Sequence, residues 1–234
     1  YRTQRRWGLH LTIDDLVSVV VGVVFGLIIG ARLFYVVFYG GGYYLAHPLE
    51  VFAVNEGGMS FHGGLVGGIV GGTIACHIYK ISAWTIADLA VCGAPLALML
   101  GRFANFVNGE LWGKPTDLPW GVAFGGAAGT MPRHPSQLYE ALLEGIVLFC
   151  VLQILSRRKP VLPQGTFMGV FVMGYGIVRF LIEFVRVPDA QLGYLLGGVI
   201  TMGQLLSLPL VVVGVVLIVC AQRKARPQCD YLEK

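Results

Sequence analysis

Long apolar stretches separated by short polar segments are the most regular feature of the sequence. Several of these stretches approach the roughly 20 residues that a helix needs to cross the hydrocarbon of a bilayer. The pattern predicts an all-α polytopic membrane protein, formed as one helical domain over residues 1–234. The six predicted spans are 16–39, 60–79, 86–106, 138–155, 166–185 and 198–221.

The composition agrees with a membrane protein and limits the classes of partner that are expected. Hydrophobic residues make up 56% of the chain and charged residues 13%, with a mean hydropathy of +0.71, whereas soluble domains are about a quarter charged. The net charge of +4 is modest and lies near the predicted helix ends, so nucleic acid is not expected as a partner. The five cysteines form no CxxC or Cys/His cluster, so neither a disulfide framework nor a metal site is expected.

Glycine recurs within the predicted spans, most densely in "GGLVGGIVGG" at 63–72. Small residues let membrane helices approach closely, so this run predicts tight packing against a neighbouring helix.

The basic residues predict the orientation of the chain. "YRTQRR" precedes the first span, Lys80 follows the second, "SRRK" follows the fourth and "QRKAR" follows the last. These segments fall on the same side of a six-span chain, and excess Lys and Arg mark the cytoplasmic side. Residues 40–59 and 107–136 are therefore expected on the outer side, as loops that form a small extramembrane cap.

Polar residues gather at the outer ends of the predicted spans. His62 begins the second span, Arg102 and Asn105 end the third, "RHPSQLYE" opens the fourth and "RFLIEFVR" closes the fifth. Ionisable residues in a membrane are costly and usually face a cavity or one another. The sequence thus predicts a polar site in the outer leaflet.

Helical spacing suggests how some of these groups pair, but leaves their purpose open. Arg179 and Glu183 are four residues apart and share one helix face, as a structural pair or as part of a site. Glu140 and Glu144 have the same spacing and either hold the helices together or act directly. Arg32 is expected to reach the membrane interface or to form a structural pair.

His62 can be interpreted in two ways. At a helix start it is either a hydrogen-bonded structural residue or a titratable base. Gly63 and Gly64 follow it and are expected to leave backbone N–H groups open at a helix N-terminus, which is a natural anion site. An imidazole beside an anion site favours the catalytic interpretation.

The stretch "GRFANFVNGELWG", residues 101–113, resembles the signature of the bacterial prolipoprotein diacylglyceryl transferases. "MSFHGGLVGG", "MPRHPSQLYEALLEG", "RFLIEFVRVPDAQLG" and "TMGQLLSLPL" resemble other blocks of that family, in the family's order. The resemblance implies transfer of a diacylglyceryl group from phosphatidylglycerol to the lipobox cysteine of a preprolipoprotein, with release of glycerol phosphate. It implies no metal or cofactor, and it places the enzyme in the bacterial cytoplasmic (inner) membrane with its site toward the outer leaflet. Family members have seven spans, so the first is expected to be missing here.

The resemblance also implies roles for individual residues. The preferred base is His62, with an arginine-assisted thiolate or a carboxylate base as alternatives. Arg102 and Arg179 are expected on the phosphate, with Glu183 holding an arginine. The resemblance carries over further signature residues: Asn105, expected to orient the headgroup, Glu110, expected to hold an arginine, and Gly113. The competing function is a non-catalytic transporter or scaffold that binds lipid or anions in the outer leaflet.

Overall fold

The computed structural model describes residues 2–187, 194–195 and 200–232, and this part of the chain is almost wholly helical. The two described strands, β1 (Tyr194–Leu195) and β2 (Ile200–Thr201), pair antiparallel. The chain divides into two compact units. The larger unit contains Tyr1–Trp7 and Ala87–Gln228, and the smaller unit contains Gly8–Ile86 and Cys229–Lys234. Each is described by itself, and the single domain over 1–234 stays a prediction.

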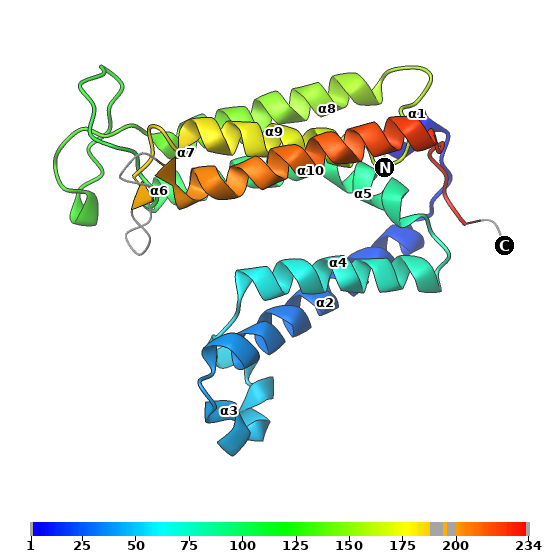
Figure 1. The fold of residues 1–234 in the computed structure, drawn as a ribbon, viewed down its shortest axis with the longest axis horizontal. Coiled ribbons are helices and arrows are strands. Elements are labelled where there is room, and N and C mark those ends of the chain that lie inside the picture. The colour runs from blue at the N-terminus through cyan, green and yellow to red at the C-terminus, as the bar shows by residue number, and fades with distance from the viewer. Residues whose placement is uncertain (1, 188–193, 196–199, 233–234) are drawn as a thin grey trace. The chain divides into compact units, whose positions relative to one another are not determined.

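The smaller unit is built on two antiparallel helices, α2 (Ile13–Tyr39) and α4 (Phe61–Ile78), which lie side by side (Figure 1). Thr12 and Asp15 form a reciprocal capping box at the start of α2. The helices meet backbone to backbone, because a Cβ added at Gly67 would strike the backbone oxygen of Gly26. The predicted packing role of the glycine-rich run is thereby confirmed. Gly22 against Gly71, and Gly30 against Gly63, repeat the same contact along the pair.

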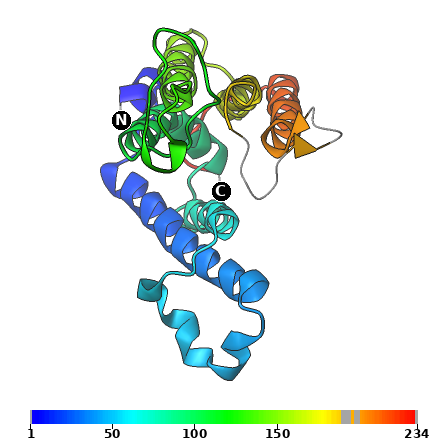
Figure 2. The same cartoon turned by 90° about the vertical axis from the view of Figure 1, so that its left-hand side faces the viewer.

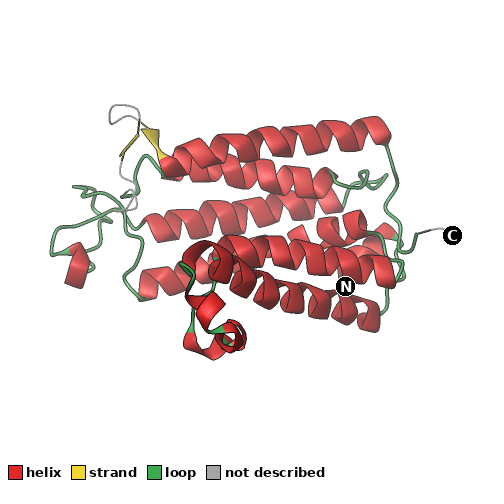
Figure 3. Cartoon of the chain, turned by 60° about the horizontal axis from the view of Figure 1, so that its bottom comes forward, coloured by secondary structure: helices red, strands yellow, loops and turns green. Residues whose placement is uncertain are grey.

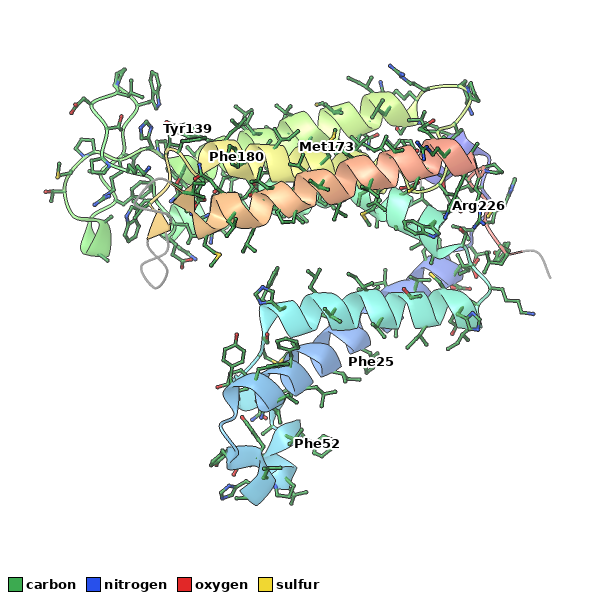
Figure 4. The ribbon with its side chains drawn as sticks, in the orientation of Figure 1. Phe25, Phe52, Tyr139, Met173, Phe180 and Arg226 are labelled. Atoms are coloured by element: carbon green, nitrogen blue, oxygen red, sulfur yellow. The ribbon has the colours of Figure 1, made fainter. Side chains whose placement is uncertain are left out.

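Three short helical turns connect α2 to α4 in the stretch predicted as an outer loop. They are α3 (Tyr43–Ala46), η1 (Pro48–Phe52) and η2 (Val54–Glu56), and Phe52 is labelled among them in Figure 4. Arg32 of α2 holds this connection in place. Arg32 is 5% exposed. Its guanidinium donates to the carbonyl oxygens of Val51 at 2.8 Å, Gly57 at 2.7 Å and Gly58 at 3.2 Å, and also to that of Glu50. Of the interpretations considered for Arg32, the structure supports a structural role.

The larger unit is a bundle in which α8, α9 and α10 run alongside one another (Figures 1 and 2). Helices α9 and α10 pack closely through glycines, since a Cβ at Gly169 or Gly214 would meet the facing helix within 3 Å. A single π-helical turn, η4, joins α7 to α8. The elements are α1 (Arg2–Trp7), α5 (Ala83–Val91, which belongs to this unit from Ala87 on), α6 (Ala94–Val107), α7 (Ser136–Glu140), η4 (Ala141–Val147), α8 (Leu148–Ser156), α9 (Thr166–Ile182) and α10 (Met202–Lys224).

The described helices confirm an all-α polytopic membrane protein. Four are long and apolar enough to cross a membrane, and a fifth span results if α5 and α6 are counted together. That pair bends by 45°, so the predicted single helix over 86–106 is in fact broken, at the Gly93–Pro95 step where proline starts α6. Helix α9 is apolar but has only 17 residues. The count of six spans in this chain therefore stays a prediction.

Basic segments gather at one end of the larger unit. Trp7 donates to the carbonyl oxygen of Ser156 at 3.2 Å, Lys159 donates to that of Arg6 at 2.6 Å, and Arg226 accepts from a loop amide at 2.9 Å. Residues 107–136 lie at the opposite end, mostly as loop with one helical turn, η3 (Gly126–Ala128) (Figures 1 and 3). Figure 4 labels Tyr139 and Arg226 at these opposite ends.

Asp88 fixes the start of α9 at the basic end of the larger unit. Its fully buried carboxylate accepts from the backbone N–H groups of Gly165 and Met168, each at 2.8 Å, and from the Gln228 amide at 2.8 Å. It therefore caps α9 from another helix, satisfying N–H groups that the first turn leaves unpaired. Because the residue at which α9 begins is fixed, the direction in which Arg179 points from this helix is fixed as well.

Candidate active site

Glu140 is the centre of a buried ionic network at the loop end of the larger unit. Its side chain is 0% exposed and contacts three guanidinium groups. Oε2 lies 2.8 Å from Nε of Arg102, and Oε1 lies 3.2 Å from Arg179 and 3.1 Å from Arg186. The arginines come from α6, from α9 and from the segment after α9, so one carboxylate ties three parts of the chain together.

Two further carboxylates complete the network. Glu144 Oε2 accepts from Nε and Nη2 of Arg102 at 3.2 and 3.1 Å. Glu183 pairs with Nη2 of Arg179 at 3.0 Å, four residues along α9. Three arginines thus face three glutamates, and the formal charges of these six side chains cancel. Burying such charges is tolerated only where they are paired and hydrogen-bonded.

Glu140 and Glu144 are four residues apart, so they lie on the same side of their helix. Glu140 ends α7, and Glu144 lies inside η4, where the wider turn shifts the register of the following residues. Insertions of this kind are frequent at functional sites. Close packing supports the arrangement, since a Cβ at Gly145 would lie 2.6 Å from Met99 of α6, and one at Gly203 would lie 2.6 Å from the Glu183 carboxyl carbon.

The signature segment folds back over the end of α6. Gly109 and Leu111 have φ of +67° and +57°, so the chain reverses direction there. The reversal brings the Glu110 carboxylate onto the amides of Asn105 and Asn108, each at 3.3 Å. Within the described part of the chain Glu110 pairs with no arginine, so the expectation that it holds one was wrong. The groups that hold Arg102 are Glu140 and Glu144.

Gly113 occupies a position with no room for a side chain. A Cβ there would lie 2.6 Å from His134 and 2.7 Å from the carbonyl oxygen of Val185. Its N–H donates to the carbonyl of His134 at 2.9 Å, and its backbone pairs with Arg186 in an isolated antiparallel bridge. Glycine is required at position 113 because the backbone of the loop approaches the segment after α9 too closely for a side chain.

His62, Gly63 and Gly64 lie at the start of α4, in the smaller unit. His62 is exposed and stacks edge-on against Phe61. The two glycines are buried, and their N–H groups are already used, since Gly63 donates to Oγ of Ser60 at 3.4 Å and Gly64 donates to its carbonyl at 2.9 Å. The expectation of open amides at these two glycines was therefore wrong, because Ser60 caps the helix.

The structure thus brings together part of the predicted site. Arg102, Arg179 and Glu183 meet within one network. Asn105 lies three residues after Arg102 on α6 and contacts Glu110. Sequence reasoning considered Glu140 mainly as a structural residue and missed its position between three arginines. The signal that could have found it is the occurrence of three arginines and three glutamates in predicted outer-end segments. In the described chain no group of three or more His, Cys, Asp or Glu side chains is placed to hold a metal.

Comparison with known proteins gives consistent matches over most of the chain. The family model for prolipoprotein diacylglyceryl transferase matches residues 1–220. A phosphatidylglycerol–prolipoprotein diacylglyceryl transferase of Geobacter sulfurreducens is 51% identical over 223 residues, which cover 95% of this chain and 84% of that protein. Proteins of the same name from Bordetella avium and Rhodospirillum rubrum are 48% and 50% identical, covering 97% and 92% of this chain and 85% and 77% of their own.

Proposed function

The chain belongs to the prolipoprotein diacylglyceryl transferase family, and from that premise we propose that it transfers the diacylglyceryl group of phosphatidylglycerol to a preprolipoprotein. The acceptor is the thiol of the lipobox cysteine at the end of a signal peptide. The products are a thioether-linked lipid and glycerol phosphate. This is the first step of bacterial lipoprotein maturation.

The observation that supports this proposal most strongly is the arginine–glutamate network. Among the described residues, Nη1 of Arg102 and Nε of Arg179 have no hydrogen-bond or ion-pair partner. The two side chains are 16% and 15% exposed, so each keeps a donor available at the margin of a buried site. Guanidinium groups match phosphate oxygens in geometry and charge. The carboxylates hold both arginines in place before a phosphate arrives.

The proposed transfer requires a sulfur nucleophile and a phosphate leaving group whose negative charge is stabilised. The cysteine thiolate attacks the glyceryl CH₂ carbon that is bound to phosphate oxygen, the S–C bond forms, and the C–O electron pair passes to the phosphate. Negative charge grows on that oxygen, and Arg102 and Arg179 are proposed to stabilise it. Asn105, held by Glu110, is proposed to orient the headgroup.

The thiol must also lose its proton, because the thiolate is the reactive species. We propose His62 as the base, since it is exposed and its ring contacts Phe61 without a hydrogen bond or ion pair to any described residue. An arginine-assisted thiolate remains the alternative mechanism.

A headgroup-release assay tests the proposed function. Phosphatidylglycerol labelled in its terminal glycerol is mixed with a lipobox peptide and the purified protein, and labelled glycerol phosphate is measured. We expect release only when the peptide carries its cysteine. The Arg102→Lys variant should lose most of it, because a point charge cannot reproduce a planar fork. A protein that binds the lipid but releases no label would instead be the non-catalytic scaffold.

We further propose that the network faces the outer leaflet of the cytoplasmic membrane, where exported preprolipoproteins arrive. The basic segments lie at the other end of the larger unit, as positive-inside orientation requires. A single cysteine at Thr130, in a background without native cysteines, should react with an impermeant thiol reagent in intact spheroplasts. One at Lys159 should react only in opened membranes. The reverse labelling pattern would contradict the orientation.

A further inference from the structure

One carboxylate of the network has an oxygen that is buried without a partner. Glu144 is 0% exposed, and its Oε2 accepts both hydrogen bonds from Arg102. Its Oε1 has no hydrogen-bond partner among the described residues. Oε2 of Glu140 and Oε2 of Glu183 also lack a hydrogen bond, but each forms an ion pair, at 2.8 Å from Arg102 and 3.0 Å from Arg179. Glu183 also keeps 5% of its side chain exposed. A buried charged oxygen without a partner is costly, and protonation removes that cost.

The charge of the network changes when substrate enters. The network already holds three carboxylates, and a phosphodiester brings one more negative charge beside them. An uncompensated charge in a buried site is strongly unfavourable. Uptake of one proton by a carboxylate offsets the added charge. Protonation costs the fewest interactions at a carboxylate that contacts a single guanidinium and has a buried oxygen without a partner. Glu144 is that carboxylate.

Charged and titratable side chains surround Glu144 on several helices. Arg102 approaches from α6, Glu140 precedes it by one turn on α7, and Tyr175 and Arg179 approach from α9. Two cations, one anion and one phenol thus surround the carboxylate. Arg102 is also the residue proposed to hold the phosphate, so that phosphate and Glu144 would share one guanidinium.

We propose that Glu144 is a catalytic proton carrier, which takes up a proton when the lipid phosphate binds at Arg102 and donates it to the departing phosphate oxygen. This inference rests on the proposed transfer reaction. As the S–C bond forms and the C–O bond breaks, the electron pair remains on oxygen, and the proton of Glu144 neutralises one of the two charges of the phosphate monoester. The thiol proton passes separately to the base. Glu144 leaves the step as a carboxylate, ready for the next lipid.

Proton uptake can be measured without chemistry, by binding short-chain phosphatidylglycerol in detergent with no peptide present. Calorimetric titration in two buffers of different ionisation enthalpy gives the protons bound per lipid. We expect about one proton per lipid in the unmodified protein at neutral pH. The Glu144→Gln variant is already neutral at this position, so it should bind the lipid with little uptake. Asp117→Asn, an exposed loop change outside the network, should behave as the unmodified protein.

The transfer assay adds a second readout. An amide cannot donate its proton in this way, so Glu144→Gln should lower turnover at saturating lipid by at least about a hundredfold, the usual range for a lost general acid. Three results with Glu144→Gln would each overturn the proposal. They are proton uptake equal to that of the unmodified protein, unchanged turnover, and loss of lipid binding. An unmodified protein that releases glycerol phosphate but binds lipid without proton uptake overturns this inference alone. A protein that releases none overturns the proposed function instead, so the two failures are distinguishable.

Discussion

Replacing Glu140 by Gln should destabilise the larger unit more than any change at an exposed carboxylate. The side chain is 0% exposed and contacts three guanidiniums at 2.8 to 3.2 Å. A glutamine of the same size offers one oxygen acceptor, and its NH₂ group would face another donor. Removing one partner of a buried ion pair costs about 3–5 kcal/mol, and we expect the Glu140→Gln variant to fall within this range.

The excess positive charge can be removed by a second change. Arg186 is 6% exposed and lies 3.1 Å from Glu140, so Arg186→Met alone should also destabilise the protein. The double variant has lost one negative and one positive charge, so the net charge of the network equals that of the unmodified protein. The two changes should therefore cost less together than the sum of their separate effects, by about 0.5–3 kcal/mol, the range seen for residues in one network.

The assay is unfolding in mixed detergent micelles with rising dodecyl sulfate, followed by tryptophan fluorescence. Asp117→Asn serves as the control, since this residue is exposed and lies outside the network. A loss below about 1 kcal/mol for Glu140→Gln, as expected of a surface pair, would refute the reasoning. So would strict additivity of the two changes, because it would mean that Arg186 and Glu140 do not share a buried charge balance.

Three other changes test separate parts of the structure. Gly67→Ala places a methyl against the backbone of α2 and should lower the free energy of unfolding by about 1–3 kcal/mol. In the control, Gly68→Ala, the added methyl meets only ordinary contacts at 3.6 Å or more, so this change should be neutral or slightly stabilising. Equal effects of the two changes would contradict the close packing of α2 and α4. Gly113→Ala should reduce transfer at least about tenfold by displacing the loop, while Gly101→Ala, with open space around it, should leave transfer intact. His62→Gln should slow transfer, because the amide keeps a hydrogen bond but cannot accept the thiol proton, and unchanged turnover would make His62 structural.

Hydrophobic pattern predicted most of the helices because bilayer-length apolar runs have few alternative structures. Five of the predicted intervals coincide with a continuous helical segment to within a few residues at most ends, but 86–106 does not. Its break depends on the Gly93–Pro95 step, which lies inside an apolar run and changes the hydropathy very little. Hydropathy measures whether a segment belongs in lipid, and it contains no information about where the segment bends.

The site was predicted in part, for a related reason. Polar residues at the ends of apolar segments indicated a polar site, and helical spacing correctly paired Arg179 with Glu183. The carboxylates that hold Arg102 were not identified. Which carboxylate contacts which arginine depends on helix register. The π-helical turn that positions Glu144, and the loop reversal that turns Glu110 toward Asn105, are properties of the folded backbone. The role that the resemblance implied for Glu110 assigned it to the wrong partner.

The signature segment and the ionic network form one closed circuit of contacts. Arg102 of α6 pairs with Glu140, Glu140 pairs with Arg186, and Arg186 pairs through its backbone with Gly113, at the other end of the segment that begins beside Arg102. Because the circuit is closed, the loop cannot shift without moving Arg186, and Arg186 cannot move without changing the charge around Glu140. A phosphate that draws Arg102 toward itself would therefore also act on the loop through Glu140. This explains why one short segment requires an arginine, paired polar side chains and a glycine with no room for a side chain: each holds a different part of the same circuit.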